Sequence, residues 1–318
     1  MTKLPDLVPH LNEFLISLQA KNYSSKTVFN YERDLSVFRD FLVVHSYTLD
    51  TISNQTIGDF SRYLVSNDRK TAGGKATTEK LSVGSVNRAL SSLRSYFKYL
   101  VDMDYKVPVS PSAIKLLKMP RTHGRVAELD SLVALIESPL KYEKDKRIAL
   151  RNRVMLEVLF ATGMRISELL SLNRDQINST GKIFIRGKGR KERFVYLTDR
   201  AKALVNDYLL TRDDDNPALF IPYSGRNSGK AKVRISPNYL QMKIKRYKEL
   251  LGIIVPTSAH SFRHGFATYL AEKGANPAAI QILLGHESLQ TTTRYVHASD
   301  KYAESTHKEF HPLSQVKK

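Results

Sequence analysis

The chain has 318 residues, a length that suits two domains, and its hydrophobic fraction of 42% is enough to bury a core and to exclude global disorder. Lys and Arg outnumber Asp and Glu by 50 to 31, so the formal net charge is +19. Such an excess indicates a polyanionic partner such as nucleic acid, although a solvated basic surface would give the same composition. With no cysteine, the chain has no disulfide, no thiolate nucleophile and no Cys-ligated zinc. No export signal or long apolar run is present, which predicts a soluble cytoplasmic protein without membrane contact.

The first part of the chain has apolar residues spaced three and four apart, the period of amphipathic helices. This spacing predicts helices over residues 7–18, 24–46, 54–65 and 82–102. On the last of these helices Arg88, Arg94 and Lys98 lie off the apolar stripe. They would meet either DNA phosphates or only water, and they are candidates for DNA contact.

Residues 119–126 combine proline, glycine and positive charge, which is typical of a linker. They are predicted to join a helical domain of residues 1–118 to a second domain of residues 127–318. The same signals predict further helices over residues 128–138, 147–163, 234–252, 260–274 and 275–286. Two β-rich runs around a glycine pair predict a hairpin over residues 182–197. The expected fold is therefore mainly α with a small β-hairpin in the second domain.

The segment HSFRHGFATYLAEKG, residues 260–274, raises a question of chemistry. On a helical wheel His260, Arg263, His264 and Ala267 fall on one face, and large apolar residues fall on the other. Ala267 is expected to leave room for something to approach the polar face. This face is a metal site, a phosphate clamp, or the polar edge of an ordinary core helix.

The residues themselves favour phosphate over metal. In the zinc motif H-E-x-x-H a glutamate follows the first histidine, whereas Ser261 stands there in this chain. The permanent charge of Arg263 would also repel a divalent cation. Arginine is a bidentate phosphate ligand, and histidine donates hydrogen bonds or moves a proton near neutral pH. A satisfied polar helix edge remains the alternative to the phosphate clamp.

Further residues of the same chemistry occur along the chain. Arg165 follows a glycine helix stop in ATGMRISELL, and Lys188 lies between two glycines at the hairpin tip in RGKGRKER. Arg190, at the same tip, is another candidate for DNA contact. His286 and Tyr295 occur in LLGHESLQTTTRYVH. A tyrosine among cations can act as a nucleophile at phosphorus, although a buried tyrosine would be the ordinary interpretation.

In chain order these residues read Arg, Lys, His-x-x-Arg, His, Tyr. This order resembles the tyrosine recombinase, or phage-integrase, family. The motifs ATGMRISELLSL, GKGRKER, HSFRHGFATYLAEKGA, LLGHESLQTTTRYVH and HKEFHP resemble its Xer branch. The N-terminal helices, with KATTEKLSVGSVNRALSSLRSYFKYL, resemble the family's core-binding domain. The resemblance covers nearly the whole chain. Phe262 stands where the Xer branch more often has leucine, a packing change that should leave the chemistry unaffected.

The resemblance implies a SAM-like core-binding domain and a catalytic domain that close as a C-shaped clamp on duplex DNA. It implies that Tyr295 attacks a backbone phosphate to form a 3′-phosphotyrosine and free a 5′-hydroxyl. A 5′-hydroxyl from a partner duplex would then rejoin the strand, so no metal, ATP or other cofactor is expected. Lys188 would protonate the leaving oxygen, and His260 would assist proton transfer from the tyrosine.

The resemblance also implies how charge at phosphorus is stabilised. Arg165 and Arg263 would hold the non-bridging oxygens, and His286 would donate a further hydrogen bond. Glu168 is expected to orient these groups at best, and otherwise to be a surface or capping residue. His264 is expected to be a residue at the helix edge, near DNA or not.

Strand exchange between two duplexes implies a homo-tetramer on DNA, or pairing with a related recombinase, with an accessory activator protein as a further possible partner. The tail of residues 300–318 is expected to contact a neighbouring protomer, or to be a frayed end. Three rival functions are a non-catalytic DNA binder, a type IB topoisomerase and a metal-dependent hydrolase. Chromosome-dimer resolution, integration, excision and inversion share one chemistry, so the residues do not separate them.

Overall fold

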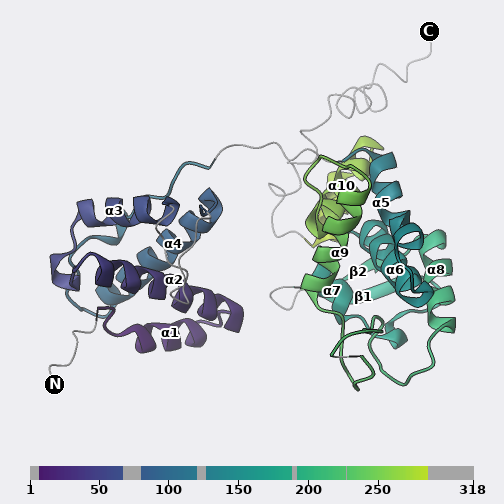
Figure 1. The fold of residues 1–318 in the computed structure, drawn as a ribbon, viewed down its shortest axis with the longest axis horizontal. Helices are drawn as coiled ribbons and strands as arrows, with labels where there is room; N and C mark the ends of the chain where they lie inside the picture. The colour runs from purple at the N-terminus through teal and green to yellow at the C-terminus, as the bar shows by residue number, and fades with distance from the viewer. Residues whose placement is uncertain (1–6, 67–79, 120–126, 188–191, 227, 286–318) are drawn as a thin grey trace, which may run out of the picture. The chain divides into compact units, whose positions relative to one another are not determined.

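The computed structural model describes residues 7–66, 80–119, 127–187, 192–226 and 228–285. The chain divides into two compact units. The first unit is Met1–Thr122 and the second is His123–Lys318, and each has its own hydrophobic core. The described residues form helices and one two-stranded sheet, which confirms the predicted fold class (Figure 1). None of the described helices is long and apolar enough to cross a membrane.

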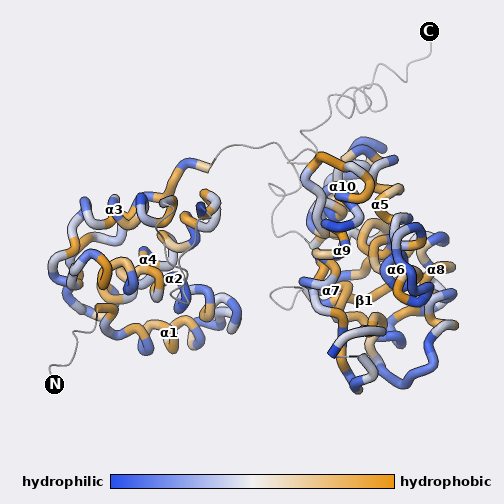
Figure 2. The backbone as a smooth tube through the Cα atoms, viewed as in Figure 1, coloured by the Kyte–Doolittle hydropathy of each residue, from blue (hydrophilic) through white to orange (hydrophobic). Residues whose placement is uncertain are grey.

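The first unit is built from four helices. They are α1 (Leu11–Ala20), α2 (Ser25–Val44), α3 (Asn54–Val65) and α4 (Val83–Asp102). Ser24, Ser53 and Ser82 cap the last three, because each side chain accepts the backbone N–H of the residue three positions on. The predicted apolar stripes meet in the core, where the ring of Phe38 contacts those of Phe60 and Phe97. Figure 2 shows the resulting alternation of hydrophobic and hydrophilic residues along these helices.

The second unit surrounds one largely buried helix. Its helices are α5 (Leu129–Tyr142), α6 (Lys146–Thr162), α7 (Ile166–Ser171), α8 (Asp199–Leu210), α9 (Pro237–Leu250), α10 (Ala259–Glu272) and α11 (Pro277–Leu284). Helix α6 packs against α5, α8 and α10, and residues on every side of it are buried. Helix α8 was not predicted from the sequence. Within the predicted helix of residues 275–286, Asn276 caps α11 and Pro277 is its first residue.

The predicted hairpin consists of β1 (Lys182–Arg186) and β2 (Glu192–Tyr196), paired antiparallel with Lys182 opposite Tyr196. Alternate residues of each strand face the core, the period expected of a half-buried sheet. Ile183, Ile185 and Val195 take inward positions, and so does Arg193. The hairpin therefore places one arginine inside the unit, beneath a tip that carries further cations in the sequence.

Candidate active site

Arg165 lies at the turn between α6 and α7. Gly163 ends α6 in the left-handed region, with φ of 60°, and a Cβ there would lie 2.4 Å from Cδ1 of Phe266 on α10. Only glycine allows this close approach of the two helices. Arg165 is the N-cap residue of α7, as the sequence predicted for the start of a new helix, and its side chain is 37% exposed. Its guanidinium thus stands at the edge of a rigid corner.

Glu168 is the carboxylate that orients this arginine. Its Oε2 accepts the backbone N–H of Arg165 at 2.8 Å, and its Oε1 accepts Nη1 of the same residue at 2.9 Å. The prediction of a capping and orienting role is confirmed, but the surface alternative is wrong, because Glu168 is only 6% exposed. Burial raises the pKa of Glu168, yet the hydrogen bonds from Arg193 and Arg165 outweigh burial and leave the pKa below its ordinary value.

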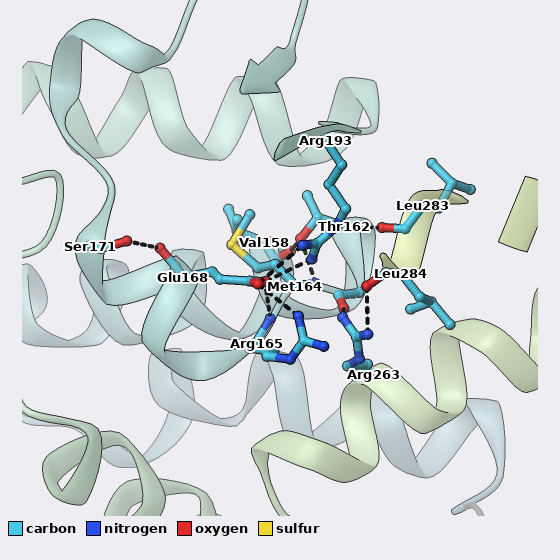
Figure 3. A network of polar contacts seen from close by, with 11 residues as sticks. Val158, Thr162, Met164, Arg165, Glu168, Ser171, Arg193, Arg263, Leu283 and Leu284 are labelled. Atoms are coloured by element: carbon cyan, nitrogen blue, oxygen red, sulfur yellow. Dashed lines mark hydrogen bonds and ion pairs between the residues drawn. The ribbon is translucent and has the colours of Figure 1, made fainter. Parts of the chain in front are cut away.

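Arg193, which was not predicted from the sequence as a site residue, completes the ion-pair network (Figure 3). Its Nη1 and Nη2 donate to the two oxygens of Glu168 at 3.1 and 2.7 Å, and its Nε donates to the carbonyl of Leu283 at 2.9 Å. Both partners of the ion pair are buried. One signal could have found it: in the alternation of β2, Arg193 occupies an inward position, where a charge needs a partner.

Arg263 lies on α10 and is also buried, at 3% exposed. Its Nη1 donates to the carbonyl of Gly163 at 2.8 Å, two residues before Arg165, and its Nη2 donates to the carbonyl of Leu284 at 2.6 Å. The guanidinium plane is therefore fixed between the end of α6 and the end of α11. This geometry brings Arg263 to the same corner as Arg165.

The expectation that Ala267 leaves an open approach is wrong. Ala267 is fully buried and packs with Ala271, Ile280 and Leu284, because α11 covers this face of α10. On the same helix His260 is exposed and His264 is half-buried. The helix thus exposes its polar face only at the N-terminal end.

His260 stands among positive charges. Neighbouring groups desolvate the imidazole of His260, although the residue as a whole is exposed, and this is the largest cause of its lowered pKa. The charges of Arg263, His264 and Arg165 lower the pKa further below the 6.5 of an ordinary histidine. The neutral imidazole is therefore the main form at neutral pH, and it can accept a proton. Arg263 binds the carbonyl of Gly163 beside Arg165, and His260 lies one turn before Arg263 on α10, so the three residues come from two separate segments to one corner.

Four predicted residues, Lys188, Arg190, His286 and Tyr295, lie outside the described residues, as does the tail of residues 300–318. Their places in the sequence are informative, since two of them follow Arg186 of β1 within the hairpin and His286 directly follows Gly285. Within the described ranges no group of three or more His, Asp or Glu side chains is arranged to hold a metal ion.

The predicted DNA contacts of α4 have partners within the first unit. Arg88 donates through Nη1 to Asp34 at 2.8 Å, and Nε of Arg94 donates to the carbonyl of Ile114 at 3.0 Å. Lys98 is exposed. Arg88 and Arg94 therefore have structural roles, and their contact with DNA stays a prediction.

Comparison with solved structures defines the class of the fold. A XerH site-specific recombinase bound to its palindromic difH substrate matches with a TM-score of 0.69 at 23% identity, covering 95% of this chain and 84% of that one. A lambda integrase tetramer bound to a Holliday junction matches with a TM-score of 0.67 at 16% identity, covering 87% and 76%. The fold is that of the tyrosine recombinases.

The family models match both parts of the chain. The phage integrase family matches residues 126–302, and the N-terminal SAM-like domain of phage integrases matches residues 11–103. The tyrosine recombinase XerC of Rickettsia canadensis is 30% identical over 99% of both chains, and that of Rickettsia felis is 29% identical over 99% of both. The chain therefore belongs to the phage integrase family, and its function is site-specific tyrosine recombination. The resemblance to the Xer branch is thereby confirmed.

Proposed function

We propose that this recombinase uses Tyr295 as its nucleophile and needs neither metal ion nor ATP. The phenolic oxygen of Tyr295 attacks the scissile phosphorus, and the bond from phosphorus to the 5′-oxygen breaks. The strand end is held as a 3′-phosphotyrosine, and the leaving 5′-oxygen takes up a proton. A 5′-hydroxyl of the second duplex then attacks the phosphotyrosine, reforms a phosphodiester and releases the phenol. Because one phosphoester replaces another at each step, no external energy source is required.

The observation that carries the proposal is the gathering of Arg165, Arg263 and His260 at one corner of the second unit. Two guanidinium groups supply oriented donors for the non-bridging oxygens, where negative charge grows in the transition state. His260, with its lowered pKa, accepts the proton of Tyr295.

Two further roles follow from the family resemblance and from position in the chain. Lys188, at the tip of the hairpin, is proposed to protonate the leaving 5′-oxygen. His286, two residues after the end of α11, is proposed to donate a hydrogen bond to the phosphate. Arg190 is proposed to bind the DNA backbone. Arg88, Arg94 and Lys98 of the first unit are proposed to bind it as well.

We further propose that residues 1–118 form the core-binding domain, residues 119–126 the linker and residues 127–318 the catalytic domain. The partner is a duplex DNA site in the cytoplasm, and strand exchange uses a tetramer of this chain or a pairing with a related recombinase. The lambda integrase tetramer on a Holliday junction supports such an assembly. Among the cellular roles that share this chemistry, the XerC relatives favour chromosome-dimer resolution over integration or excision of a mobile element. An accessory activator protein is a further proposed partner.

The test is to trap the covalent intermediate on nicked duplexes from which the cleaved fragment diffuses away, with EDTA present throughout and no nucleotide added. We expect a protein–DNA adduct that survives denaturation and whose peptide mass places the DNA on Tyr295. Tyr295→Phe should form none. Tyr302→Phe, a matched change seven residues further along the sequence, should retain the adduct.

Salt-sensitive DNA binding without any adduct would indicate the non-catalytic binder. An adduct on another residue would overturn the assignment of the nucleophile, and loss of the adduct in EDTA would overturn metal independence. Relaxation of supercoiled DNA without strand exchange between two sites would favour the type IB topoisomerase.

A further inference from the structure

We propose that Arg193 is a positioning residue of the recombination reaction, which ties the phosphate-binding Arg165 to the end of α11, the helix that precedes His286 in the sequence. The inference rests on the proposed function, because it assigns Arg193 a task in the chemistry of that site. It concerns a residue of β2 that touches neither DNA phosphate nor nucleophile in the proposed mechanism.

The end of α11 is held by two buried arginines. The last carbonyls of a helix have no partner within the helix, and the partial negative charge there favours a cation. Arg193 binds the carbonyl of Leu283 at 2.9 Å, and Arg263 binds that of Leu284 at 2.6 Å. Two successive carbonyls at one helix end are thus fixed by cations from β2 and α10.

The two terminal nitrogens of Arg193 connect it to Arg165 through Glu168. Both of its terminal nitrogens donate to Glu168, and Glu168 in turn accepts from the backbone and the guanidinium of Arg165. Figure 3 shows the resulting path from Arg165 through Glu168 and Arg193 to Leu283. Because the two middle links, Glu168 and Arg193, are both buried, a displacement at one end is transmitted through packed groups.

Gly285, the residue that ends α11, leaves room for the Arg193 side chain. It adopts φ of 65°, and a Cβ there would lie 3.0 Å from Cδ and 3.2 Å from Nη1 of Arg193. The backbone at Gly285 therefore turns directly over the Arg193 side chain. The position of that side chain and the backbone turn at Gly285 are therefore linked.

A neighbouring arginine provides the contrast. Arg186 also forms an ion pair with a glutamate, donating to Oε1 of Glu192 through Nε and Nη2. Both side chains of that pair are exposed, at 65% and 45%, and they lie on the hairpin itself. Arg186 therefore has the chemistry of Arg193 without its burial or its reach to α11, and it is the matched control.

The first experiment compares Arg193→Lys and Arg193→Gln with Arg186→Gln in the full chain on a cognate nicked duplex. A lysine keeps the charge beside Glu168, but one ammonium nitrogen does not replace three nitrogens that reach Glu168 and Leu283 together. We expect both Arg193 variants to bind DNA as the wild type does and to cleave about 100-fold more slowly at saturating protein, the order of loss caused by small misplacement of reacting groups. Arg186→Gln should cleave at the wild-type rate.

A second measurement separates positioning of α11 from positioning of Lys188, since Arg193 also belongs to the hairpin. In a duplex with sulfur in place of the bridging 5′-oxygen, the thiolate leaves without a proton, so loss of Lys188 is tolerated. We expect Lys188→Ala to be rescued by this substrate and the Arg193 variants to remain slow. Rescue of the Arg193 variants would overturn the action through α11.

A third experiment changes Gly285, which contacts the Arg193 side chain, and so tests the same contact even if Arg193→Gln does not fold. Gly285→Ala places a Cβ against Arg193, whereas Gly274→Ala places one at φ of 84° with nothing within 4 Å. Both carry the strain of a left-handed alanine, but only Gly285→Ala should slow cleavage with DNA binding retained. Equal effects of the two, or wild-type cleavage by Arg193→Lys, would overturn the inference. Absence of an adduct from the wild type would instead overturn the proposed function.

Discussion

The substitution Glu168→Gln removes one negative charge from the buried network and leaves its shape in place. Glu168 and Arg193 have side chains that are only 5% and 6% exposed, so the guanidinium would be left buried beside a neutral amide. Removing one partner of a buried pair costs about 3–5 kcal/mol. The glutamine oxygen retains part of the hydrogen bonding, so we expect a loss of about 2–4 kcal/mol in the free energy of unfolding. For a domain of this size, that lowers Tm by about 4–16 °C.

The pH dependence gives the same prediction a second measurement. The pKa of Glu168 is lower in the folded chain than its ordinary value of 4.5. Its contribution to stability is therefore complete above pH 4.5 and is lost as the pH falls through the folded pKa. Calorimetric unfolding at pH 7 should show the full difference between wild type and Glu168→Gln, and acidification below pH 4.5 should shrink it.

Glu192→Gln is the control, because it removes the same charge from the exposed pair with Arg186. Exposed pairs contribute about 0–1 kcal/mol, so its Tm should stay near that of the wild type. If Glu168→Gln were as harmless as Glu192→Gln at pH 7, or if its deficit were constant down to acid pH, the assigned role of the buried carboxylate would be refuted.

Two further predictions concern the first unit and the proton acceptor. Arg88→Ala should lower the free energy of unfolding of the first unit by about 1–3 kcal/mol, because it leaves Asp34, whose side chain is 4% exposed, without the arginine that pairs with it. Arg62→Ala is the control, because Arg62 is exposed, and it should change the free energy of unfolding little. Chemical denaturation measures both. Because the pKa of His260 is lowered below 6.5, single-turnover cleavage should persist at pH 6.5 and decline only as His260 becomes protonated at lower pH. His260→Gln should lower the rate by about 10²–10⁴-fold and abolish that acidic decline; a decline unchanged in the variant would assign it to another group.

Most of the helices, though not α8, could be predicted from local signals, because periodicity and caps depend on neighbouring residues. Helix periodicity, the serine cap at position 24 and the Asn276–Pro277 start each depend on a few neighbouring residues. The glycine stop at position 163 belongs to the same group. Helical spacing alone placed His260 and Arg263 on one face, but only the order of the family motifs joined Arg165 to them.

What could not be predicted depends on contacts between distant elements. The helical wheel of α10 separates a polar from an apolar face, but it does not show that α11 covers Ala267 and Arg263. Glu168 looked like a surface residue because its partner Arg193 comes 25 positions later, on a strand. Tertiary packing decides whether a charged side chain is buried. Sequence periodicity describes a single helix or strand, so it does not show which other element covers that side chain.

The three arginines differ in the kind of partner that holds them, and the difference suits their proposed tasks. Arg193 shares the carboxylate of Glu168, which neutralises charge inside the unit, where an unpaired cation would be costly. Arg263 is oriented by the carbonyls of Gly163 and Leu284, which fix a guanidinium without cancelling its charge. Arg165 shares Glu168 with Arg193, so these three cations and one carboxylate carry a net +2. A phosphate that gains charge in the transition state would meet positive groups already held in place, and little reorganisation would be needed as the reaction proceeds.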